Sequence, residues 1–336
     1  MVIIVEFPAV ENAETWFELW KGAGDKQYRL KEYDNAYFCY GEALGYCPND
    51  LDCLKRRFDL LMRENNYDDC AKALTAGRRI MELDPSCFKC LICIAKCYVH
   101  LGDVVSAEDA VEQAVNIEPD SPAFKKLRND IEMIRDCTEQ AKTAQNKGAH
   151  KEVLNLTNRG LAIAPFSIEL KLLKAESLVY RGDPAEGFKL SSDALNCDQN
   201  NRHAAYVQGL SLYYLSELKT SKQLTLRVLK EEDEEAPTYK KAKKLYKTIE
   251  KIQRHIGDGN KHIEEKQFVE ARDLFKQALN IDPSNKMLNS KLHYTLADIW
   301  IHQKHLERAY DSCSRALKLD PKNKKAQKLR ARLLGE

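Results

Sequence analysis

The 336-residue sequence lacks the long apolar runs and the charge excess that mark several protein classes. It contains no stretch of 18 uncharged apolar residues, so we expect no membrane-spanning helix and no membrane partner. The apolar start, Met1 to Val5, has no basic flank and is interrupted by Glu6, so it does not fit a signal peptide. The net charge is only +2, which leaves no overall footprint for binding nucleic acid. Fourteen glycines and ten prolines are too few for long irregular loops.

The sequence also lacks the short motifs that carry catalysis. It has no Gly-x-Ser-x-Gly, no phosphate-binding Gly-x4-Gly-Lys, no His-Glu-x-x-His and no kinase motif set. Gly257-Asp258-Gly259 resembles the start of a dinucleotide loop, but no strand pattern precedes it. The eight histidines are scattered along the chain. We therefore expect no catalytic activity and no cofactor.

What the sequence does contain is helical periodicity. Its clearest stretch is Ile252 to Ser284, which has the pattern of two short amphipathic helices. In the second of these, apolar residues recur at three- and four-residue spacing, at Phe268, Ala271, Leu274, Phe275, Ala278 and Leu279. Pro283 ends this helix, because proline has no N–H to continue the hydrogen-bond ladder. Gly259 and Ala271 mark points where two helices approach closely, and Phe275 fills the gap between them.

The same frame recurs along the chain. Its four clearest copies place a small residue and a terminal proline at the same offset, at Gly24 and Pro48, Ala95 and Pro119, Gly259 and Pro283, and Ala297 and Pro321. A helix–turn–helix unit with a period of about 34 residues is the signature of the tetratricopeptide repeat (TPR). The sequence therefore predicts an all-α TPR superhelical solenoid of about eight and a half repeats.

These repeats divide the chain into four expected segments. They are a lead-in at 1–13, repeats one to three at 14–121, a long linking helix with repeats four to six at 122–236, and a basic helix with repeats seven and eight and the first helix of a ninth at 237–336. Repeat two has a turn at Asn65-Asn66-Tyr67, and a short insertion at 286–290 precedes repeat eight. The lysines of the basic helix predict a solvated helix face rather than a nucleic-acid site.

The cysteines give two further expectations. Eleven is an odd number, and most fall inside predicted helices, which favours reduced thiols in the cytoplasm over a disulfide framework. Cys87, Cys90, Cys93 and Cys97 have the spacing of a bacterial ferredoxin segment, without the proline that should follow. The last three lie three and four residues apart on one helix face, which favours core packing. Metal binding through Cys87–Cys97 stays open as a remote alternative.

Three segments resemble one family in particular: Tyr206–Tyr214, Asp258–Lys261 and Ala278–Asn285. They are similar to segments of the TPR-containing J-domain co-chaperones of the DnaJ homologue subfamily C member 7 type. The resemblance extends from about Glu14 to Arg332. It implies grooves that hold the acidic C-terminal tails of the 70-kDa and 90-kDa heat-shock chaperones, followed by a J domain. The J-domain motif His-Pro-Asp does not occur, so we expect the J domain and direct ATPase stimulation to be absent from this chain.

In that family, lysine, asparagine and arginine side chains on successive first helices form a clamp for a terminal carboxylate. The resemblance places the N-terminal clamp positions at Lys21, Asp25, Arg56, Lys89 and Cys93. Lys21 and Lys89 are retained, and Arg56 adds a cation. Asp25 replaces an amide donor with an acceptor, and Cys93 removes a cation.

The C-terminal clamp positions are Ile256, Asn260, Thr295, Lys325 and Leu329, of which only Asn260 and Lys325 are retained. Each lost bidentate arginine removes a contact worth about 1.5–3 kcal/mol. Two or more losses in each groove predict an affinity lower by about a hundredfold. The expected peptide-binding residues are Lys21, Arg56, Lys89, Asn260 and Lys325.

The sequence thus predicts a non-catalytic TPR co-chaperone or adaptor in the cytoplasm. We expect it to bind chaperone or client peptides in its concave groove, with weakened affinity for heat-shock chaperone tails. The alternative is a general TPR scaffold for protein interactions that is unrelated to those tails.

Overall fold

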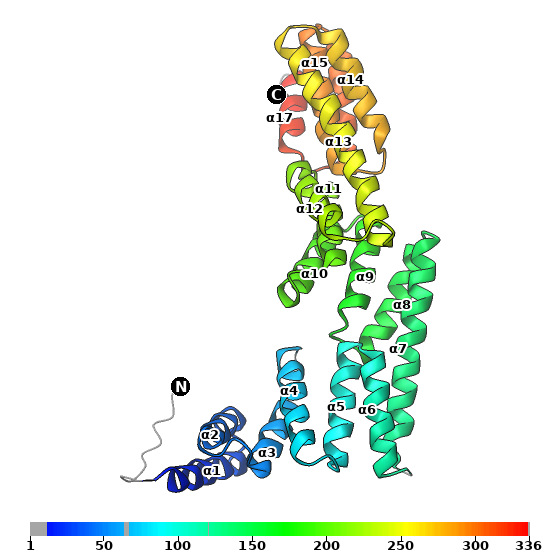
Figure 1. Ribbon diagram of the computed structural model, residues 1–336. Coiled ribbons are helices and arrows are strands. Elements are labelled where there is room, and N and C mark those ends of the chain that lie inside the picture. The colour runs from blue at the N-terminus through cyan, green and yellow to red at the C-terminus, as the bar shows by residue number, and fades with distance from the viewer. Residues whose placement is uncertain (1–11, 64–66, 120, 335–336) are drawn as a thin grey trace. The chain divides into compact units, whose positions relative to one another are not determined.

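The computed structural model describes residues 12–63, 67–119 and 121–334. Within these ranges the chain forms seventeen α-helices and no strand (Figure 1). The expected all-α class is therefore confirmed. Asn65 and Asn66 of the predicted turn and most of the 1–13 lead-in lie outside the described residues, whereas Tyr67 is the first residue of a helix.

The chain folds as two compact units, residues 1–143 with 155–170 and residues 144–154 with 171–336. The helices that lie in or reach into the first unit are α1 (Ala13–Arg29), α2 (Tyr33–Tyr46), α3 (Leu51–Leu61), α4 (Tyr67–Leu83), α5 (Phe88–Leu101), α6 (Val104–Ile117), α7 (Ala123–Asn146) and α8 (His150–Ile163). Those mainly of the second unit are α9 (Ile168–Tyr180), α10 (Pro184–Cys197), α11 (Arg202–Tyr214), α12 (Leu218–Glu231), α13 (Pro237–Glu264), α14 (Phe268–Ile281), α15 (Lys286–His302), α16 (Leu306–Leu319) and α17 (Lys324–Leu334).

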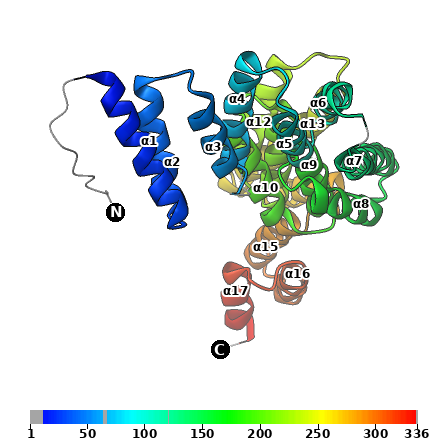
Figure 2. The same ribbon diagram turned by 90° about the horizontal axis from the view of Figure 1, so that it is seen from below.

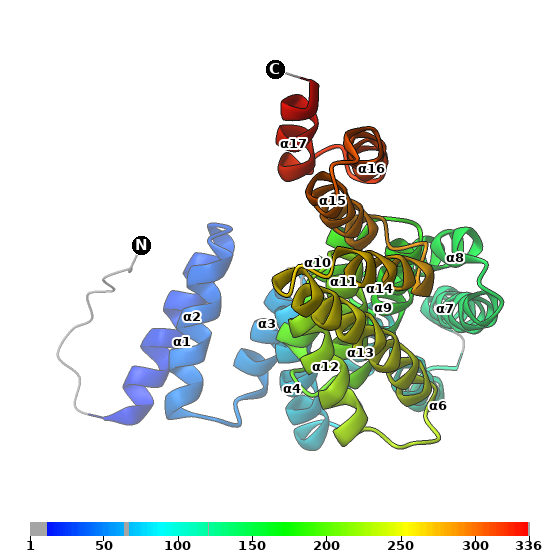
Figure 3. The ribbon, with the colours of Figure 1, turned by 90° about the horizontal axis from the view of Figure 1, so that it is seen from above.

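Successive helices pack against each other within each unit. In the first unit α1 lies beside α2 (Figure 2), and in the second unit α15 and α17 both contact α16 (Figure 3). The odd-numbered helices are the first helices of the repeats. In the second unit α11 contacts both α13 and α15, so first helices of successive repeats lie close together. This arrangement places their side chains on a shared surface.

Small residues permit these close contacts. A Cβ atom added to Gly24 in α1 would lie 2.7 Å from the ring of Tyr40 in α2, and one added to Gly259 in α13 would lie 2.8 Å from the ring of Phe275 in α14. The two pairs occupy equivalent positions in their repeats, and both rings are almost fully buried. The glycines are therefore required by helix packing, since a larger side chain would push the two helices apart.

Two helices are longer than the repeat requires. α7 has 24 residues, and α13 has 28 residues that join the basic segment to the first helix of repeat seven without a break. Residues 286–290, which the sequence suggests as an insertion, form the first turn of α15. The hydroxyl of buried Ser290 in this turn donates to the carbonyl of Ala316, 2.8 Å away. The added turn thus anchors α15 to α16.

The cysteine run lies on helix α5, with Cys90 and Cys97 buried. The expectation of reduced thiols is wrong for one pair, because Cys87 and Cys90 form a disulfide at the start of α5. Their Cα atoms are 5.3 Å apart, a separation that a disulfide can bridge. No other disulfide forms among the described residues. Within the same residues, no group of three or more His, Cys, Asp or Glu side chains is arranged to hold a metal ion. None of the described helices has the length and apolar character of a membrane span.

Candidate functional site

The N-terminal clamp positions lie on the first helices of three successive repeats, and we call them the first groove (Lys21, Asp25, Arg56, Lys89 and Cys93). Lys21 is on α1 and Arg56 on α3. The ammonium of Lys21 lies 3.3 Å from carboxylate oxygens of both Asp50 and Asp52. Arg56 Nε lies 3.4 Å from Asp25 and 3.5 Å from Asp52. Asp52 therefore brings Lys21 and Arg56 together as the shared partner of two cations.

Lys89, on α5, pairs with a different carboxylate. Its ammonium lies 3.0 Å from Asp59 on α3, and 74% of its side chain is exposed. Cys93 lies half-buried one turn further along α5, and burial raises the pKa of its thiol. The thiol is therefore neutral at ordinary pH and offers no charge to a bound carboxylate.

The carboxylates of the first groove are held by the fold. Asp25 accepts a hydrogen bond of 2.7 Å from the Tyr40 hydroxyl. Asp50 caps α3 by accepting the backbone N–H of Cys53 at 2.9 Å. Burial works to raise the pKa of Asp50, but the hydrogen bonds from Cys53 and Lys21 outweigh it, and the pKa lies below 3.8. Three cations thus face the four carboxyl groups of Asp25, Asp50, Asp52 and Asp59, with which an acidic ligand would have to compete.

The C-terminal clamp positions lie on α13, α15 and α17. Asn260 and Lys325 are exposed on α13 and α17. Leu329 is buried in a small cluster with Ala297 and Cys313. The position that would carry a clamp arginine therefore serves packing between α15, α16 and α17. These positions offer one amide and one lysine to a ligand.

A second recess lies on the first helices of the second unit. We call it the tyrosine cavity; it has a volume of about 380 Å³ and is lined by Tyr180, Tyr206, Leu210, Tyr213, Tyr214, Lys241, Lys244, Leu245, Thr248, Ile281 and Asp282. Apart from the last two, these residues come from α9, α11 and α13. An adjoining cavity of about 600 Å³ shares Tyr180 and Tyr214 with it and is lined by Pro184, Pro283, Met287 and Leu319 among others. The tyrosine cavity lies along the first helices of three successive repeats, and the adjoining cavity extends it to Met287 on α15 and Leu319 on α16.

A buried carboxylate fixes the three helices that line the tyrosine cavity. Glu176 on α9 is 2% exposed and accepts two hydrogen bonds from the Lys241 ammonium on α13, at 2.8 and 3.0 Å. His203 Nε2 on α11 lies 3.4 Å from the same carboxylate. Burial works to raise the pKa of Glu176, but the hydrogen bond from His203 and the charge of Lys241 outweigh it and lower the pKa. Lys241 is thus part of the scaffold, whereas Lys244 is exposed at the cavity.

The tyrosines are held in place by separate contacts. The Tyr213 hydroxyl donates to Asp282 at 2.7 Å, and Asn285 Nδ2 donates to the Tyr213 carbonyl at 2.9 Å. Tyr180 and Tyr214 meet edge to face with ring centroids 6.1 Å apart. Tyr180 keeps 42% of its surface exposed, so the cavity presents an aromatic ring to solvent. A fixed aromatic surface beside a lysine can stack apolar side chains and hydrogen-bond a peptide backbone.

Comparison with known proteins agrees with this architecture. A tetratricopeptide-repeat family model matches residues 262–333. The TPR domain of P58(IPK) aligns with a TM-score of 0.63 at 18% identity, over 96% of this chain and 88% of that domain. The chain is a TPR solenoid. The predicted fold is therefore confirmed.

The TPR chain is also similar to curated DnaJ homologs. It is 28% identical over 283 residues to the DnaJ homolog subfamily C member 7 of Mus musculus, covering 84% of this chain and 56% of that protein. It is 24% identical over 286 residues to the homolog from Dictyostelium discoideum, covering 84% and 52%. The resemblance found in the sequence is confirmed. The chain spans about half the length of these relatives.

The tyrosine cavity of the TPR chain was not predicted from the sequence. The sequence does contain a pattern that could have indicated it, because Tyr206 and Tyr213 are seven residues apart and so share one face of α11. The buried partner of Lys241 was not visible, because Glu176 lies 65 residues earlier and meets it only in the folded unit. For the same reason, the carboxylates that pair with Lys21 and Arg56 were not anticipated.

Proposed function

We propose that this TPR chain is a non-catalytic adaptor of the chaperone system that holds an extended peptide on the first helices of its repeats. The observation that carries the proposal is the tyrosine cavity, which spans the first helices of three successive repeats. Similarity to the DnaJ homologs supports the link to chaperones. A cytoplasmic location stays a prediction from the cysteine distribution.

The peptide that suits the tyrosine cavity has apolar side chains next to acidic ones. Tyr180 and Tyr214 offer ring faces and edges, and Lys244 offers an exposed ammonium. The acidic C-terminal tails of heat-shock chaperones, which end in Glu-Glu-Val-Asp, have this character. Lys21, Arg56, Lys89, Asn260 and Lys325 act as weaker contacts in our proposal. In the first unit this weakness follows from ion pairs that already occupy the three cations.

A calorimetric titration with a peptide ending in Glu-Glu-Val-Asp tests the proposal. We expect saturable binding with a dissociation constant of about 100 µM, a free energy of about −5.5 kcal/mol. Tyr180→Ala removes an exposed ring and should weaken binding about fivefold, since stacking contacts contribute about 1 kcal/mol. Tyr310→Ala is the matched control, because Tyr310 is 37% exposed on α16 and lines neither cavity. Failure to saturate by about 1 mM peptide would reject tail binding.

The carboxylates of the first groove favour a second candidate function. Four of them surround three cations, which is an unfavourable setting for an acidic tail. The chain would then be a general TPR scaffold that binds partners of another composition through its first helices. A neutral peptide, in which the acidic residues are replaced by glutamine and the C-terminus is amidated, separates the two functions. Equal or tighter binding of the neutral peptide supports the scaffold, and weaker binding supports the chaperone adaptor.

A further inference from the structure

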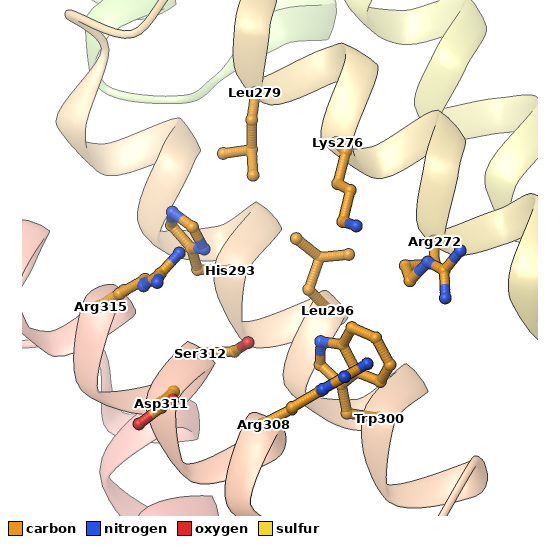
Figure 4. A pocket seen from close by; sticks show the side chains of 10 residues that line it. All are labelled: Arg272, Lys276, Leu279, His293, Leu296, Trp300, Arg308, Asp311, Ser312 and Arg315. Carbon is orange, nitrogen blue, oxygen red and sulfur yellow. The ribbon is translucent and has the colours of Figure 1, made fainter. Parts of the chain in front are cut away.

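A third cavity of the second unit lies among α14, α15 and α16 (Figure 4). It has a volume of about 440 Å³ and is lined by Arg272, Lys276, Leu279, His293, Leu296, Trp300, Arg308, Asp311, Ser312 and Arg315. We call it the basic cavity. Two of its walls are the second helices of repeats seven and eight, so it is built differently from the tyrosine cavity. Its volume falls within the range of small-molecule sites.

Four cationic side chains converge on the basic cavity from two helices: Arg272 and Lys276 from α14, and Arg308 and Arg315 from α16. Arg272 has a carboxylate partner in the adjacent Asp273, at 3.0 Å. Lys276, Arg308 and Arg315 form no ion pair with any described residue. Asp311 is the one carboxylate among the residues that line the cavity. Even with Asp273 and Asp311 counted against them, positive charge is in excess.

Trp300 holds the cations without neutralising them. Its ring centroid lies 4.9 Å from the Arg308 guanidinium, 5.3 Å from that of Arg272 and 6.0 Å from the Lys276 ammonium. The indole is 8% exposed, so these side chains cover it. Because a cation–π contact involves the ring quadrupole and no formal negative charge, the cations keep their charge for a ligand. Figure 4 shows Lys276 and Arg308 approaching the space beside Trp300 and Leu296 from opposite sides.

His293 lies at the other end of the basic cavity, where Figure 4 shows the Arg315 side chain beside it. Burial lowers the pKa of His293, and the charge of Arg315 lowers it further. The imidazole is therefore neutral at ordinary pH and provides a hydrogen-bonding group beside the arginine. The hydroxyl of buried Ser312 lies between these two groups and Trp300.

We propose that the basic cavity binds a small soluble anion that carries several phosphate groups. The planar guanidinium of arginine matches phosphate oxygens in a bidentate manner, and three arginines with one lysine can engage more than one phosphate group. The charges converge on one cavity rather than following a row of first helices, which suits a compact polyanion better than an extended acidic peptide. This site is separate from the tyrosine cavity and its peptide, so either can bind without the other.

Calorimetric titration of the full chain with inositol hexakisphosphate tests the proposal. We expect a dissociation constant of about 10 µM, with heats that shrink as salt screens the charges. Lys276→Gln and Arg315→Gln each remove one cation without a carboxylate partner and should weaken binding about tenfold. Lys318→Gln is the matched control, because Lys318 is exposed on α16 and lies outside the cavity; it should change the affinity less than about twofold.

The outcomes that overturn the proposal are distinct. No binding heat up to about 1 mM ligand would show that the cavity holds no polyphosphate. Equal weakening by Lys276→Gln and Lys318→Gln would indicate general attraction to a basic surface. Pyrophosphate and citrate separate phosphate from carboxylate chemistry, and the proposal requires pyrophosphate to bind more tightly. A melting temperature for each variant within about two degrees of wild type confirms that the fold is intact.

Discussion

The first groove and the basic cavity contain similar numbers of cations in opposite electrostatic settings. In the first groove, Lys21, Arg56 and Lys89 each contact a carboxylate at 3.0 to 3.5 Å. In the basic cavity, Arg272, Lys276 and Arg308 lie around the ring of Trp300, and of these only Arg272 also pairs with a carboxylate. The number of cations in a groove is therefore a poor guide to its affinity for anions, because affinity depends on which cations the fold has left without a carboxylate.

The same distinction separates two lysines of α13. Lys241 neutralises buried Glu176, whereas Lys244 is exposed. Lys241→Ala should lower the free energy of unfolding by about 3 kcal/mol, because it leaves a buried carboxylate without its cation. Lys244→Ala should change it by less than about 0.5 kcal/mol. Urea denaturation of both variants checks this prediction, and equal effects would show that the buried pair does not stabilise the second unit.

Acid should remove the contribution of Glu176. Its folded pKa is lowered below the ordinary value of 4.5, so its stabilising effect is complete above that pH and is lost as the pH falls through the folded pKa. Glu176→Gln should therefore be less stable than wild type near neutral pH, and the difference should shrink below pH 4.5. Denaturation at a series of pH values measures this. A difference that stays constant on acidification would mean that the carboxylate charge is not what matters.

Exposed pairs of the first groove should contribute little to stability. Lys89→Ala removes a pair whose lysine is 74% exposed, so the free energy of unfolding should change by less than about 0.5 kcal/mol. The same change should weaken binding of the Glu-Glu-Val-Asp peptide about threefold. Thermal unfolding and calorimetry of one preparation give both quantities. A large fall in melting temperature would assign Lys89 a structural role instead.

Much of the fold could be predicted because the repeat frame is local. Gly259 and Phe275 lie within one helix pair, and their spacing alone indicates the contact that the structure shows. The sites depend on contacts between repeats, which spacing does not reveal. Asp52 reaches both Lys21 and Arg56, and Glu176 meets a lysine 65 residues away. The disulfide between Cys87 and Cys90 does not follow from spacing for a different reason, since a cysteine on a helix face, such as Cys90, serves equally well in core packing.

The role of the clamp positions in binding stays a prediction, and their electrostatic setting could not be predicted from the sequence. The positions are those that the resemblance implies, whereas the pairing of Lys21 on α1 with Asp50 and Asp52 at the start of α3 depends on how successive repeats pack. At Leu329 the folded structure explains a substitution. The side chain is buried in a packing cluster, which accounts for the absence of a clamp arginine at that position. Both cases require the folded unit.

Calorimetric titration of the Glu-Glu-Val-Asp peptide into the Asp52→Asn variant is the most direct test of the central claim. The claim is that pairing with carboxylates weakens the binding of an acidic peptide by the cations of the first groove. Asp52 contacts both Lys21 and Arg56, and its side chain is 54% exposed, so the change should leave the fold intact. Because Lys21 keeps Asp50 and Arg56 keeps Asp25, we predict that the variant binds the peptide about threefold more tightly than wild type, and that adding Lys21→Ala abolishes this gain. An Asp52→Asn variant that binds no more tightly than wild type would contradict the account.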